Sequence, residues 1–171
     1  MKRSLTNQVL LGIGAGYLAS KLMDRVTTAY QDRQSEASKQ REKELQEEPA
    51  YVKAAERLAQ IRGLDLDQQR AERLGLRLHR GLGLSGGVTG GLLVARGMNP
   101  LGAGLLSGLG LWLVIDEGAN ALLGLTPPPN AYPRETHVRG LVGHFAYGGA
   151  LGLLLALGNA LLLRSGEPKE G

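Results

Sequence analysis

Residues 81–95 read GLGLSGGVTGGLLVA, a run of 15 residues without a charge that is flanked by arginine on both sides. Gly83, Gly87 and Gly91 recur every four residues, and this spacing places them on one face of a helix. In a bilayer, helices associate through close backbone packing, which small residues permit. The stretch therefore predicts a membrane helix with one face reserved for another helix.

The same pattern occurs in three further stretches of the chain. Residues 4–20 are uncharged over 17 positions, residues 97–115 over 19 and residues 140–163 over 24, where only a histidine interrupts the apolar pattern. A bilayer span needs about 20 largely apolar residues. We therefore expect an all-α membrane protein with four transmembrane helices in a glycine-rich bundle. The glycines on the expected packing faces are Gly12, Gly16, Gly83, Gly87, Gly91, Gly104, Gly108, Gly148 and Gly152.

A charged insert separates the first of these helices from the second. Residues 21–80 hold 24 of the 36 charged residues, in near balance as 13 basic and 11 acidic side chains, which argues against a nucleic-acid surface. Residues 49–62 have helical spacing of apolar residues, and Asp65 or Asp67 can cap the helix that follows. The predicted organisation is a first membrane helix at 1–25, a charged extramembrane helical insert at 26–74, three further membrane helices at 75–164 and a polar tail at 165–171.

Sequence motifs for catalysis or for cofactor binding are missing. The chain has no cysteine, which excludes disulfides, thiolate metal sites and cysteine nucleophiles. No phosphate-binding loop, HExxH helix or nucleophile elbow occurs in the sequence. We therefore predict that the protein is not an enzyme and has no cofactor, and the sequence identifies no residue as a metal ligand.

Ionisable residues interrupt the apolar faces of the expected helices. Such groups cost several kcal/mol in a bilayer unless they are paired or hydrated, so they mark a candidate functional site. The arrangement fits three interpretations: proton or small-ion handling, a structural clasp between helices, or a metal site. The residues of this predicted intramembrane polar cluster are Asp116, Glu117, His144, Tyr147, His79 and His137.

The second half of the chain carries a series of short motifs in a fixed order. GLTPP at 124–128 is followed by Tyr132-Pro133, Thr136-His137 and GHFAYG at 143–148. In this order the chain resembles the uncharacterised bacterial YagU-like inner-membrane proteins, a family of unknown function. The likeness covers roughly residues 5–25 and 49–163. It implies a multi-pass protein of the bacterial inner membrane and supplies no established reaction.

The expected function is therefore that of a multi-pass inner-membrane protein whose polar cluster handles protons or small ions. The alternative is a structural or partner-binding membrane subunit whose charged insert docks another protein. The expected partners are the lipid bilayer and either a second copy of the chain or another membrane protein, with no nucleic acid.

Overall fold

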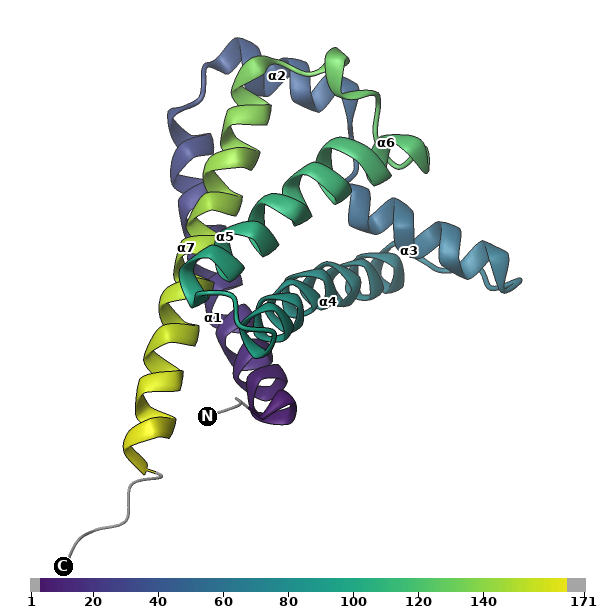
Figure 1. Ribbon diagram of the computed structural model, residues 1–171. Helices are drawn as coiled ribbons and strands as arrows, with labels where there is room; N and C mark the ends of the chain where they lie inside the picture. The colour runs from purple at the N-terminus through teal and green to yellow at the C-terminus, as the bar shows by residue number, and fades with distance from the viewer. Residues whose placement is uncertain (1–3, 166–171) are drawn as a thin grey trace, which may run out of the picture.

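The computed structural model describes residues 4–165, and within this range every regular element is helical (Figure 1). The all-helical prediction is therefore confirmed. The elements are α1 (Leu5–Arg33), α2 (Glu36–Leu45), α3 (Ala50–Ile61), α4 (Gln68–Ala95), α5 (Pro100–Leu111), the π-helix η1 (Trp112–Ala119), α6 (Asn120–Leu122), the 3-10 helix η2 (Pro129–Ala131) and α7 (Arg134–Ser165).

The two longest helices, α1 and α7, run antiparallel along each other, and α4 and α5 cross them (Figure 1). From their shared turn, α4 and α5 diverge, and α5 continues through η1 and α6 as one helix. The helix α2 lies over the end of the molecule where α1 finishes and α7 begins, while α3 packs along the first half of α4. The insert is thus part of the packed structure rather than a separate body.

The crossing of α1 with α4 is built from glycines. A Cβ added to Gly12 would collide with the backbone of Gly87, and one added to Gly16 would lie 2.9 Å from the Gly87 Cα. A Cβ at Gly91 would collide with the carbonyl oxygen of Gln8. Since backbone faces backbone here, no side chain fits between the two helices.

A second crossing of the same kind joins α5 to α7. A Cβ at Gly108 would lie 2.5 Å from the His144 carbonyl oxygen, and one at Gly148 would lie 2.8 Å from the Gly104 carbonyl oxygen. A Cβ at Gly152 would lie 2.7 Å from the Leu101 Cα. The glycines of α1 therefore pack against those of α4, and the glycines of α5 pack against those of α7.

Among residues 4–165, two helices are long and apolar enough to cross a membrane, at Pro100–Leu122 and Arg134–Leu163. Only 22% and 33% of the residues in their most apolar windows are buried, whereas the core helix of a soluble protein would be mostly enclosed. The prediction of four spans is not supported by this measure, because α1 and α4 do not reach the required hydropathy. Their uncharged runs are short, and glycine adds little hydropathy to them.

The helices do not end at the predicted domain boundaries. The first helix continues past residue 25 to Arg33, and α4 is one helix across the boundary at 74. On the inner face of the insert, Val52 and Ala55 are buried, and a Cβ at Gly75 would lie 2.5 Å from the Tyr51 carbonyl oxygen. Apart from Ser165, the predicted polar tail lies outside the described residues.

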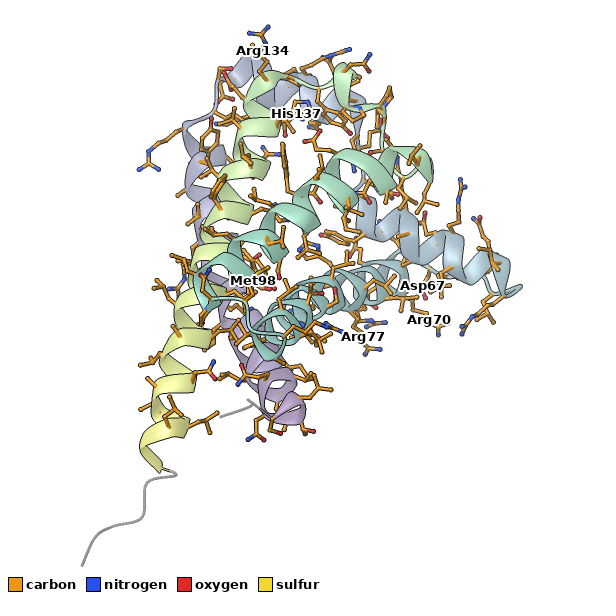
Figure 2. All side chains as sticks on the ribbon, in the orientation of Figure 1. Asp67, Arg70, Arg77, Met98, Arg134 and His137 are labelled. Carbon is orange, nitrogen blue, oxygen red and sulfur yellow. The ribbon has the colours of Figure 1, made fainter. Side chains whose placement is uncertain are left out.

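Local capping fixes the two ends of α4 (Figure 2). The carboxylate of Asp67 accepts a hydrogen bond from the Arg70 amide at 2.8 Å, so Asp67 supplies the predicted cap. Beyond the other end, Gly97 has φ +100°, a conformation that other residues rarely adopt, and it allows the tight turn beside Met98 into α5.

Candidate functional site

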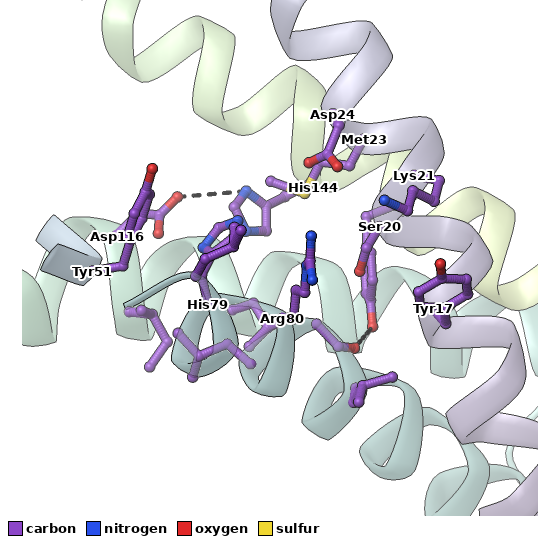
Figure 3. Close-up of a pocket in the computed structure, with 17 residues that line it drawn as sticks. Tyr17, Ser20, Lys21, Met23, Asp24, Tyr51, His79, Arg80, Asp116 and His144 are labelled. Carbon is purple, nitrogen blue, oxygen red and sulfur yellow. Dashed lines mark hydrogen bonds and ion pairs between the residues drawn. The ribbon is translucent and has the colours of Figure 1, made fainter. Parts of the chain in front are cut away.

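A cavity of about 310 Å³ lies between α1, α3, α4, η1 and α7 (Figure 3). Four of the six predicted cluster residues line it, from three different segments: His79, Asp116, His144 and Tyr147. The fold therefore brings together side chains that are up to 68 positions apart in the sequence.

The central pair in this first cavity is His144 and Asp116. The Nδ1 of His144 lies 3.0 Å from the Gly140 carbonyl oxygen and 3.6 Å from Asp116 Oδ2. The shorter distance is a hydrogen bond, so Nδ1–H donates to the helix backbone, while the carboxylate lies within ion-pair distance. The His144 side chain is 7% exposed and that of Asp116 is 42% exposed, so the carboxylate is the group that contacts the cavity's contents.

The other two predicted residues of the first cavity have different surroundings. The Tyr147 hydroxyl donates a 2.6 Å hydrogen bond to the Gly83 carbonyl oxygen, and the residue is only 1% exposed. This bond ties α7 to α4. The ring of His79 lies 5.5 Å from that of Tyr51 on α3, which fixes the insert beside the cavity.

A second cavity of about 270 Å³ contains the remaining predicted pair, Glu117 and His137. The distance from His137 Nδ1 to Glu117 Oε1 is 2.8 Å, and Nε2 lies 2.9 Å from the Pro129 carbonyl oxygen. Both ring nitrogens therefore face acceptors. A neutral imidazole has one N–H and satisfies one of them, whereas the protonated ring donates to both.

The structure divides the predicted single cluster into two parts that meet at Asp116. Only Asp116 and Met23 line both cavities among the described residues. Both carboxylates, Asp116 and Glu117, lie on the π-helix η1 (Trp112–Ala119), within the stretch where the sequence predicts three further membrane helices. Because consecutive residues of a helix point in different directions, Asp116 lines both cavities whereas Glu117 lines only the second. Such π-helical segments are frequent at functional sites.

A polar network beside the second cavity connects the insert to α7. The guanidinium of Arg139 donates to Glu42 Oε2 at 2.8 Å and to Gln34 Oε1 at 2.7 Å. The hydroxyl of Thr136 donates to Glu42 Oε1 at 2.6 Å. These residues were not predicted from the sequence, although Arg139 is marked by its place directly before the uncharged run at 140–163.

The second cavity also contains an unpaired donor. The indole Nε1 of Trp112 is buried and makes no hydrogen bond within residues 4–165. A bound water or a polar solute in this cavity would supply the missing acceptor. Over the same residues, no group of three or more metal-binding side chains could hold an ion.

No protein-family model, no curated protein and no solved structure matches this chain. The resemblance to the YagU-like proteins therefore remains a prediction from the motifs alone.

Proposed function

We propose that this chain is a multi-pass inner-membrane protein that passes protons or small cations between two cavities by way of Asp116. The observation that carries the proposal is the position of Asp116, whose side chain lines both cavities. The Glu117–His137 pair lies on one side of it, and His144 and His79 lie on the other.

Residence in the membrane is supported by the molecular surface. Large apolar side chains are exposed along α1, along the α5–α6 helix and along the second half of α7. A soluble protein rarely exposes so continuous an apolar surface. Examples on the three helices are Leu10, Leu18, Leu106, Leu113, Leu153 and Leu157.

We further propose that α1 and α4 complete the membrane part as third and fourth spans, despite their shorter uncharged runs. Their glycine crossing joins them closely to each other, and α1 also packs along α7. Arginine and lysine at the ends of such runs reach the water interface with their long side chains.

The chemistry of the site suits proton exchange. Carboxylates and imidazoles both accept and release protons, and imidazole is the side chain that does so near physiological pH in water. The exposed Asp116 carboxylate is accessible to water in either cavity. Chains of Asp, Glu and His are typical of proton relays in membrane proteins. The 3.6 Å separation of Asp116 from His144 leaves room for the carboxylate to change partner.

The test is proton flux in vesicles that contain the purified full chain and an internal pH-sensitive dye. We expect flux above that of empty vesicles, and Asp116→Asn should abolish it without changing the melting temperature. Asp65→Asn is the matched control, because Asp65 is an exposed carboxylate that lines neither cavity. Wild-type vesicles that behave like empty ones between about pH 4 and pH 8, with Asp116→Asn less stable, would instead establish a structural clasp.

A partner-binding role is a second proposal, and it rests on the outer face of α2. The side chains of Glu36, Arg41 and Glu44 there are 89%, 54% and 53% exposed. A second copy of the chain is the simplest partner, and the mass of the detergent-solubilised protein tests it. A dimer that Arg41→Glu converts to a monomer would support this role, and a wild-type monomer would oppose it.

A further inference from the structure

Two cations line the first cavity and have no role in the proposed proton path. Lys21 comes from α1 and Arg80 from α4, and neither side chain makes a salt bridge or a hydrogen bond within residues 4–165. The only interaction of Lys21 there is with the Tyr17 ring, whose centroid is 5.6 Å from Nζ. In Figure 3 both cationic groups extend toward the centre of the cavity.

The packing register places these two cations at one level of the bundle. The helices α1 and α4 run antiparallel, with Gly12 against Gly87 and Ser20 against Gly83. Lys21 directly follows the uncharged run at 4–20, and Arg80 directly precedes the uncharged run at 81–95. Both charges therefore lie where the uncharged run of each helix ends. If the chain spans the membrane as proposed, this position is at the level of the lipid phosphates.

We propose that the first cavity binds the headgroup of a phospholipid that carries a phosphate and a primary amine. The phosphate lies between Lys21 and Arg80, since lysine and arginine are the side chains that donate charge-assisted hydrogen bonds to phosphate. This inference rests on membrane residence but not on proton transfer.

The carboxylates of the cavity select the amine. A purely anionic ligand would be repelled by Asp24 and Asp116, which line the same cavity. Asp116 already lies beside His144, whereas Asp24 makes no salt bridge within the described residues. Asp24 is one turn after Lys21 on α1, so it is the carboxylate placed to accept the ammonium of a headgroup whose phosphate is held by Lys21.

The size and walls of the cavity favour a lipid over a soluble phosphate compound. A volume of about 310 Å³ is at the lower end of ligand pockets and suits a headgroup without its acyl chains. The apolar wall includes Leu76 and Leu82, which are 38% and 37% exposed. Next to the cavity, Leu18 and Leu22 of α1 are 54% and 43% exposed. Acyl chains leaving the cavity would cover this surface.

The experiment is native mass spectrometry of the delipidated full chain in detergent, titrated with four probes. Dioleoyl phosphatidylethanolamine has phosphate, amine and tails, and dioleoyl phosphatidylglycerol lacks the amine. Diolein lacks the headgroup, and O-phosphoethanolamine lacks the tails. We expect phosphatidylethanolamine to bind most tightly, phosphatidylglycerol more weakly, and the other two not at all.

The decisive variant is Lys21→Gln with Arg80→Gln, which should weaken phosphatidylethanolamine binding about tenfold or more, because charge-assisted hydrogen bonds to the phosphate are lost. The matched control is Arg25→Gln with Arg77→Gln, which removes two exposed cations from the same helices but outside the cavity. We expect binding by this control to equal that of the wild type. The variant Lys21→Arg with Arg80→Lys keeps both charges and should also retain the lipid.

Asp24→Asn should remove the preference for phosphatidylethanolamine over phosphatidylglycerol. The proposal is overturned if both double glutamine variants lose binding equally, since charge alone would then attract the lipid. It is also overturned if diolein or O-phosphoethanolamine binds as tightly as phosphatidylethanolamine. Because flux is not measured, failure here leaves the proton proposal standing.

Discussion

The middle of helix α7 is fixed by close backbone packing, whereas its beginning is fixed by hydrogen bonds between polar side chains. In the middle, Gly148 and Gly152 lie against the α5 backbone with no side chain between them. In the first turns, Thr136 and Arg139 reach α2 through hydrogen bonds to Glu42. The glycine crossing therefore tolerates no added volume, whereas the polar contact tolerates volume but no loss of charge.

Two adjacent glycines of α7 give the strongest test of this difference between the glycine crossing and the polar contact. A Cβ at Gly148 would lie 2.8 Å from the Gly104 carbonyl oxygen and 2.9 Å from the Leu105 Cα, whereas a Cβ at Gly149 has nothing within 4 Å. We expect Gly148→Leu to lower the free energy of unfolding by about 3 kcal/mol or to prevent folding, because α5 is forced away. Gly149→Leu should instead be neutral or stabilise the helix by about 0.5 kcal/mol.

Thermal unfolding in detergent, followed by circular dichroism, measures both variants. Equal melting temperatures for Gly148→Leu and Gly149→Leu would show that the close crossing does not hold the bundle together.

The second prediction concerns the polar beginning of α7. Arg139 and Glu42 have side chains only 20% and 15% exposed, and they are joined at 2.8 Å. Arg139→Met should destabilise the protein by about 2 kcal/mol, because it leaves the Glu42 carboxylate half-buried without its cation. Arg139→Met combined with Glu42→Gln should recover part of the loss. A double variant as unstable as the sum of the two single ones would mean that the pair does not interact.

The sequence predicted the glycine crossings better than the polar contacts. Repeats such as Gly12 and Gly16 mark a packing face on one helix, since spacing of four is a local property. Which two packing faces contact each other depends on segments that are distant in the sequence, so the pairing of α1 with α4 appears only in the structure. The contact of Arg139 with Glu42 spans 97 positions, and no spacing rule relates two such residues.

The residues of the candidate site could be predicted from the sequence, but their distribution between two cavities could not. Asp116, His144 and His79 were identified as ionisable groups on apolar faces, and the structure places them around one cavity. The separation of Glu117 into a second cavity depends on which elements pack around η1, and these contacts with residues distant in sequence have no local sequence signal. Lys21 and Arg80 were missed as ligand-binding candidates, although both flank uncharged runs.

The third prediction tests a polar contact inside the apolar part. The amides of Gln8 on α1 and Asn159 on α7 are 2% and 7% exposed and hydrogen-bond each other at 2.7 and 3.1 Å. Gln8→Leu or Asn159→Leu alone should cost about 1.5 kcal/mol, because the remaining amide is buried without its partner.

With both residues changed to leucine, the loss should nearly disappear, since no unpaired polar group remains. Chemical unfolding of the three variants in detergent checks this. A double variant less stable than either single one would contradict the paired-amide interpretation.

The smallest expected effect concerns alkaline pH and Tyr132, which lies in the loop before α7. Its hydroxyl donates a 2.6 Å hydrogen bond to Gln46 Oε1. Burial, with a smaller contribution from the negative charge of Glu42, raises the pKa of Tyr132 above its ordinary value of 10.0. Because the folded-state pKa is the higher one, the stabilisation is fully present below pH 10.0 and is lost as the pH rises through the raised pKa.

Tyr132→Phe should therefore cost about 1 kcal/mol at neutral pH, the value of one hydrogen bond, and make the unfolding free energy fall less steeply above about pH 10 than in the wild type. The control is Tyr30→Phe, because the Tyr30 hydroxyl makes no hydrogen bond within residues 4–165. Superimposed curves for wild type and Tyr132→Phe at neutral and at alkaline pH would show that the contact between the insert and the loop does not contribute to stability.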